Sequence, residues 1–225
     1  MMAAVKKGNA KEFADLITED PGFKVNGRDG AGRTLLSNAC LDGKDFVIPL
    51  LLAHPEVDVN AKDKERLTPF MVACIRGHIS CVHLLLKDSR VKVNEPCSKW
   101  TPLCRAAEEG HLDIIKLWIA SGKEMDLGTP GNDYTDAIGQ SKLYGKAAVA
   151  SLLLRFKSDA TRTRSEVREE LKINGENTVP FLNFRIRSLF DNSHFRIPCE
   201  LSAKDHIRPI HNLGQLDERQ DYHVS

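Results

Sequence analysis

The chain carries an internal repeat with a period of about 34 residues. Threonines mark the period, and successive ones lie 34, 33 and 34 residues apart: Thr34, Thr68, Thr101 and Thr135. In the first three units an alanine follows five residues after the threonine and a glycine nine residues after it. A run of large apolar residues comes sixteen to eighteen residues after it. A unit of this length cannot bury its own apolar face, so the sequence predicts a stack of similar units.

One unit shows how the local chemistry favours two short helices. Thr68 can cap the free N–H groups of a helix that begins with Pro69, which has no N–H to lose. The small Ala73 lets a neighbouring helix approach, and Gly77 can end the first helix with a positive φ. A second helix then carries Leu84-Leu85-Leu86 on its apolar face. Each unit is therefore predicted to be a helix–turn–helix.

These motifs resemble the ankyrin repeat over roughly residues 3–157. The best matches are Thr68-Pro69-Phe70 with Ala73 and Gly77-His78, and Thr101-Pro102-Leu103 with Gly110-His111-Leu112. The resemblance implies an all-α ankyrin-repeat solenoid of stacked helix–turn–helix units with short β-hairpin turns, a C-terminal capping helix and an irregular tail. It also implies that the rings of His78 and His111 bond to loop backbone.

The predicted organisation follows the threonines. The boundaries are a partial N-terminal unit over 1–33, ankyrin repeats over 34–67, 68–100 and 101–134, a degenerate repeat over 135–160, a capping helix over 161–173 and a non-repeat tail over 174–225. Thr163 and Glu166 have the spacing of a capping box, which favours a closing helix over 164–172. The tail is interpreted as unstructured. The alternatives are that it docks on the repeats or on a partner, or that it is a gene-model error.

The predicted hairpins depart from the family pattern at one position. Similar repeats carry glycine two residues before the threonine, where the turn needs a positive φ. Here Gly32 alone fits, and Arg66, Lys99 and Asp133 occupy the equivalent positions. The hairpin before Thr101 is also one residue short and contains Pro96. We therefore expect irregular or looser hairpins, at a cost of about 1 kcal/mol in each strained turn.

Composition excludes several classes of protein. The formal net charge is +1, from 32 Lys+Arg and 31 Asp+Glu, which argues against nucleic-acid binding by bulk charge. Arg185-Ile186-Arg187 keeps nucleic acid as a minor alternative. No apolar run is long enough to span a membrane, and residues 1–9 do not resemble a signal peptide. We therefore expect the six cysteines to be reduced, and a monomeric cytoplasmic protein, with the nucleus as an alternative.

No motif predicts catalysis, a cofactor, a small-molecule substrate or a metal. Cys74, His78, Cys81 and His83 fall within ten residues, but they have no Cys-x-x-Cys pair and a predicted helix end separates them. Packing is the favoured interpretation, and a metal- or thiol-linked role of Cys74 and Cys81 is the remote alternative. Glu108-Glu109 is interpreted as a solvated face rather than an acid–base pair, so we expect a non-enzyme.

The resemblance places the partner-binding surface on the concave face formed by the hairpins and first helices. The outward positions selected as candidates are Arg33, Leu41, Leu67, Ile75, Arg76, Trp100, Glu108, Glu109 and Tyr134. Leu67, Trp100 and Tyr134 occupy one repeat position in succession, and tryptophan, tyrosine and arginine are enriched at interface hot spots. Two alternatives are that Trp100 and Tyr134 fold back on their own hairpins, or that the phenylalanine-rich tail docks on this patch.

The predicted function is protein–protein recognition as an adaptor or scaffold. The alternative is an inhibitor or regulatory subunit that occludes a partner enzyme. The family resemblance also matches Asn60 and Asn94 to a hairpin asparagine that asparaginyl hydroxylases modify in similar repeats. The simpler interpretation is that each of these asparagine side chains bonds its own turn.

Overall fold

The computed structural model describes residues 24–128 and 136–173. Most of the predicted N-terminal unit and the whole predicted tail therefore lie outside the described residues. The helices are α3 (Leu35–Leu41), the 3₁₀ turn η1 (Asp45–Val47) that leads into α4 (Ile48–Ala53), α5 (Pro69–Arg76), α6 (Ile79–Lys87), α7 (Pro102–Glu109), α8 (Leu112–Ser121), α9 (Ala137–Leu143), α10 (Ala147–Ser158) and α11 (Ala160–Glu170).

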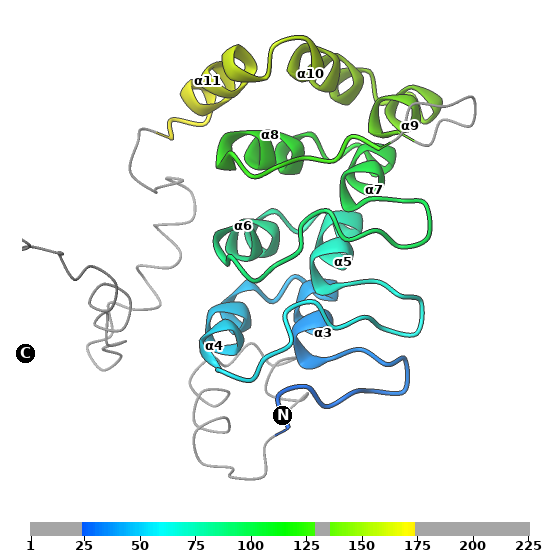
Figure 1. Cartoon of the computed structure of the whole chain (residues 1–225), viewed down its shortest axis with the longest axis vertical. Helices are drawn as coiled ribbons and strands as arrows, with labels where there is room; N and C mark the ends of the chain where they lie inside the picture. Colours follow the sequence, from blue (N-terminus) through cyan, green and yellow to red (C-terminus); the bar gives the residue numbers. More distant parts are fainter. Residues whose placement is uncertain (1–23, 129–135, 174–225) are drawn as a thin grey trace, which may run out of the picture. The chain divides into compact units, whose positions relative to one another are not determined.

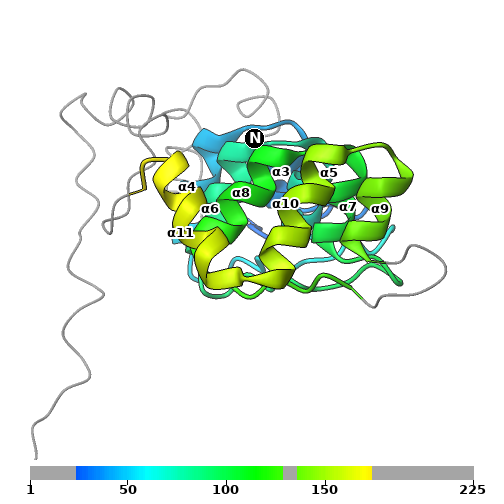
Figure 2. The same ribbon diagram turned by 90° about the horizontal axis from the view of Figure 1, so that it is seen from above.

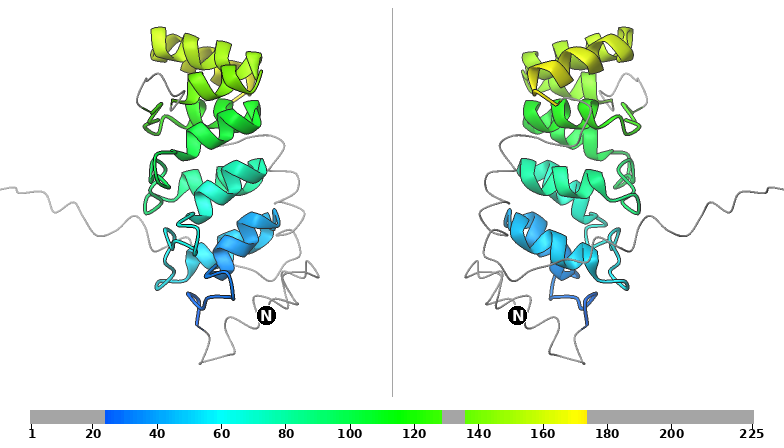
Figure 3. Two further views of the ribbon diagram at one scale, coloured as in Figure 1. Left: turned by 90° about the vertical axis from the view of Figure 1, so that its right-hand side faces the viewer. Right: turned by 90° about the vertical axis from the view of Figure 1, so that its left-hand side faces the viewer.

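The helix pairs stack in two rows (Figures 1 and 3). The first helices α3, α5, α7 and α9 pack successively against one another, and the second helices α4, α6 and α8 do the same. Ala39, Ala73 and Ala106 are fully buried, which confirms that the small residue allows the close approach of neighbouring first helices. The predicted all-α solenoid is confirmed.

The predicted helix ends are also confirmed in the regular units. The hydroxyl oxygen of Thr68 accepts a hydrogen bond from the N–H of Met71, and Thr101 caps α7 in the same way. Gly77 and Gly110 end their helices in the left-handed conformation, with φ of 73° and 81°. These local signals therefore fix the length of each first helix.

The loops before the first helices turn back on themselves without forming strands. Among the described residues the loops contain only one isolated antiparallel bridge, between Cys97 and Trp100. Positive φ occurs at Gly32 (77°), Arg66 (66°) and Ser98 (57°). In the loop before Thr101, which is one residue shorter, the left-handed residue is Ser98 and not Lys99 at the family's glycine position.

Helix α11 closes part of the C-terminal end (Figure 2). Asp159 is its N-cap, and Thr163 is buried inside the helix, so the capping-box interpretation of Thr163 is wrong. Arg164 and Arg168 donate from Nε to the carbonyl oxygens of Ile119 and Ala120 at the end of α8, over 3.1 and 2.8 Å. Helix α11 thus packs against both α8 and α10.

Across 24–128 and 136–173, every helix is too short or too polar to span a membrane.

Candidate partner-binding face

The candidate residues lie on the first helices or on the loops that precede them, which project on the same side (Figure 1). Arg76 and Glu109 are exposed at the ends of α5 and α7. The other described candidates are half-buried: Arg33, Leu41, Leu67, Ile75, Trp100 and Glu108. Tyr134 lies outside the described residues, so the structure does not place the third member of the predicted ladder.

Two cationic side chains lie near the indole ring of Trp100. The Nζ of Lys99 is 5.3 Å from the indole centroid, and the guanidinium carbon of Arg105 is 5.2 Å from it. The ring also packs against the edge of the core. Trp100 is therefore held by its own loop and by α7, with part of its surface open to solvent.

Glu108 connects this tryptophan to the next unit. Its Oε2 accepts a hydrogen bond of 2.8 Å from Nη1 of Arg105, one turn earlier on α7. The Glu108 carboxylate beside the hydroxyl of Tyr144, in the next unit, raises the pKa of that tyrosine. Tyr144 is 52% exposed. Lys99, Trp100, Arg105, Glu108 and Tyr144 form one connected group, called here the Trp100 cluster.

Spacing from the repeat threonines does not select Arg105 or Tyr144. In the fourth unit the glycine comes one residue late, so counting from the threonine selects Lys142-Leu143 as outward positions. Counting back from Gly145 selects Leu143-Tyr144 instead. Arg105 lies three residues before Glu108 on α7, a helical spacing that places the two on one face.

Leu67 and Arg33 belong to a second, more buried group. Leu67 packs against the core, and its N–H donates to Oδ1 of Asp63 over 2.9 Å. Asp63 is almost fully buried, and its other oxygen lies 3.6 Å from Nε of Arg33 in the preceding loop. These residues tie neighbouring loops together and present less free surface than the Trp100 cluster.

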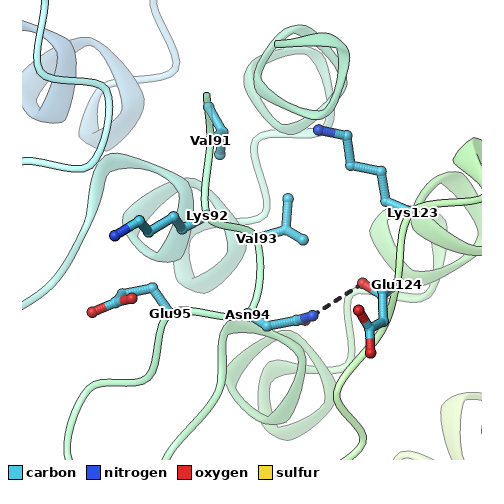
Figure 4. Close-up of a pocket in the computed structure, with 7 residues that line it drawn as sticks. All are labelled: Val91, Lys92, Val93, Asn94, Glu95, Lys123 and Glu124. Carbon is cyan, nitrogen blue, oxygen red and sulfur yellow. Dashed lines mark hydrogen bonds between the residues drawn. The ribbon is translucent and has the colours of Figure 1, made fainter. Parts of the chain in front are cut away.

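The loop asparagines join one unit to the next. Nδ2 of Asn60 donates to the carbonyl of Arg90 over 2.8 Å, and its Oδ1 accepts from the N–H of Lys92 over 2.8 Å. Asn94 makes the same pair of bonds, with Nδ2 donating to the carbonyl of Glu124 over 3.3 Å (Figure 4). The prediction that these side chains bond their own turns is wrong, because both partners lie about 30 residues further on.

The Cys/His set belongs to the packing between units. Burial raises the pKa of the Cys74 thiol, and burial and the charge of Asp45 raise that of Cys81 to about 12. The Nε2 of His78 lies 3.1 Å from the carbonyl oxygen of Leu41, as the resemblance implies for this histidine. Within the described ranges no three potential metal ligands gather at one point. Raised thiol pKa values disfavour the thiolate that a metal or an electrophile requires.

The sequence comparison agrees with the geometry. The family model described as ankyrin repeats (3 copies) matches residues 1–95 and 36–129. The chain belongs to the ankyrin repeat family. The helix pairs α3–α4, α5–α6 and α7–α8 lie within the matched residues, and α9 and α10 continue the stack beyond them. The comparison with curated proteins finds no match. Ankyrin repeats generally mediate protein–protein interaction.

Proposed function

We propose that this ankyrin repeat protein is a non-catalytic adaptor or scaffold that binds a protein partner through its loop and first-helix face. The observation that carries the proposal is the Trp100 cluster. It combines a half-buried tryptophan, an exposed tyrosine and an arginine on one face, and these residue types are enriched at the centres of interfaces.

Preorganisation supports the same proposal. Arg105 contacts the indole of Trp100 and donates to the carboxylate of Glu108, so two partners hold its guanidinium in one place. Side chains that already occupy one geometry lose less conformational freedom when a partner binds. The exposed Arg76 and Glu109 lie at the ends of the neighbouring first helices and would form part of the polar rim.

The test is a pull-down from cell lysate with the full chain as bait, followed by measurement of Kd for each retained protein. Trp100→Ala and Tyr144→Ala are compared with Ile79→Ala, which removes an exposed apolar side chain from the start of a second helix. Each variant must first keep the helical circular dichroism of the wild type.

We expect Trp100→Ala to weaken a true partner by at least about 30-fold, the loss typical of an interface hot spot. Ile79→Ala should leave the affinity unchanged. Equal binding by the wild type and both cluster variants would contradict the proposal. If the partner is an enzyme that loses activity in the complex, the role is that of an inhibitor rather than of an adaptor.

A further inference from the structure

The α9–α10 end of the stack carries an open groove. It has a volume of about 530 Å³ and is lined from α9, the following turn and α10 by residues that include Lys142, Gly145, Ala150, Leu154 and Arg155. These residues are distinct from the Trp100 cluster. The groove faces the side on which a further repeat would stack.

Leu154 occupies an interior position of the repeat. It follows Gly145 by nine residues, as Leu86 follows Gly77 and Ile119 follows Gly110. Leu86 is 4% exposed and Ile119 is fully buried, whereas Leu154 is 45% exposed. Leu52, at the same place after Gly43, is half-buried. The side chain at this place is therefore half-buried or buried in the three preceding repeats and exposed in the last.

The turn at Gly145 is also not packed against a following unit. A Cβ added to Gly43 or Gly77 would meet the ring of the next unit's histidine, and a Cβ on Gly110 would meet the side chain of Lys146. A Cβ added to Gly145 would meet no atom within 4 Å. Helix α11 packs on α8 and α10, and neither it nor any other described element covers this turn.

The chain itself supplies an apolar segment that could occupy the groove, a short linker beyond α11. Residues 181–186 read Phe-Leu-Asn-Phe-Arg-Ile, with four large apolar side chains in six positions. Residues 174–180 can extend over at most about 24 Å. This reach exceeds the length of α11, which is roughly 16 Å. The linker can therefore run back from the C-terminal end of α11 to its N-terminal end, beside α10. Covalent linkage also gives it an effective concentration in the millimolar range, above that of most free partners.

We propose that residues 181–186 of this chain occupy the α9–α10 groove, with their apolar side chains against Ala150 and Leu154, in the place of a following repeat. The proposal does not depend on the proposed function, because it concerns a different face of the stack.

The test places a photoreactive phenylalanine derivative at position 154 of the full chain. After irradiation, the monomeric product is digested and the cross-linked peptides are identified by mass spectrometry. The matched control carries the same group at position 148, which is exposed on α10 and does not line the groove. Position 147 lines the groove and replaces position 154 if that variant loses its helical circular dichroism.

We expect position 154 to cross-link to the peptide that contains residues 181–186, and position 148 to give little of this product. The double substitution Phe181→Ser/Phe184→Ser should lower the yield by at least about tenfold, because two large apolar contacts are lost. Cross-linking to a second copy, equal yields at 154 and 148, or an unchanged yield in the double variant would overturn the proposal.

Discussion

The ring of His111 lies over Gly77, the C-terminal cap of α5 in the preceding unit. Its Nε2 is 3.0 Å from the carbonyl oxygen of Ile75, two residues before that glycine. His78 and Gly43 have the same relationship one unit earlier. The histidine therefore bonds to a carbonyl oxygen that the end of the first helix leaves without a helical partner. The ring can reach this oxygen because glycine has no side chain in its way.

Gly77→Ala should destabilise the protein in two ways. An alanine at φ 73° costs about 1–2 kcal/mol. Its Cβ would also lie 2.5 Å from Cε1 of His111, so the ring must move, at a further cost of about 1–3 kcal/mol. Gly145→Ala is the matched control, since it has φ 67° and open space and should show only the first cost. Urea unfolding followed by circular dichroism measures both, and equal losses would contradict the role of the histidine.

Arg66→Gly should stabilise the protein by about 1 kcal/mol. Arg66 has φ 66°, a conformation that glycine adopts without the steric penalty of a side chain. Ser98→Gly, at φ 57°, should act in the same direction. Lys99→Gly is the control, because Lys99 does not have a positive φ and glycine there only adds flexibility to the unfolded chain. A stabilising Lys99→Gly with a neutral Ser98→Gly would show that the left-handed residue is at 99.

Local signals in the sequence predict the fold well because the competing conformations are decided within a few residues. Thr68, Pro69 and Gly77 mark the limits of α5 by capping and by backbone conformation. The left-handed residue at 98 and the start of α11 are not predicted, because neither is decided by a short motif alone. The first depends on a one-residue deletion in the loop, and the second on the burial of Thr163, which a capping pattern does not reveal.

The candidate face is predicted less completely than the fold. Trp100 is found by its position before the threonine, but its neighbour Arg105 comes from the following helix. Tyr144, beside Glu108, comes from another unit. Their convergence depends on how the units stack, which spacing from the threonine does not give. The inter-unit bonds of Asn60 and Asn94 are missed for the same reason, since an asparagine in a turn usually bonds its own backbone.

Acid should destabilise the protein partly through His83. Burial, together with the charge of Lys87, lowers its pKa from 6.5 to about 4, so the folded state keeps the ring neutral. The unfolded chain binds a proton below pH 6.5. The contribution of His83 to the free energy of unfolding is therefore fully present above pH 6.5 and is lost as the pH falls towards 4. Unfolding measured from pH 7 to pH 4 should show a smaller loss for His83→Gln than for the wild type. An NMR titration of His83 near its ordinary pKa would contradict this.

Cys97 should be the most reactive thiol among the described residues. It is half-buried in a loop, with its Sγ 3.2 Å from the carbonyl oxygen of Glu65, whereas Cys40, Cys74, Cys81 and Cys104 are buried and burial raises their pKa values. A thiol reagent at pH 8 should therefore label Cys97 rapidly and the buried four only as fast as the protein opens. Cys199 lies outside the described residues, so the informative variant is Cys97→Ser/Cys199→Ser. We expect it to react fully only in denaturant. Rapid labelling of Cys74 or Cys81 in the folded variant, identified by peptide mass spectrometry, would restore the thiol-linked role as a serious alternative.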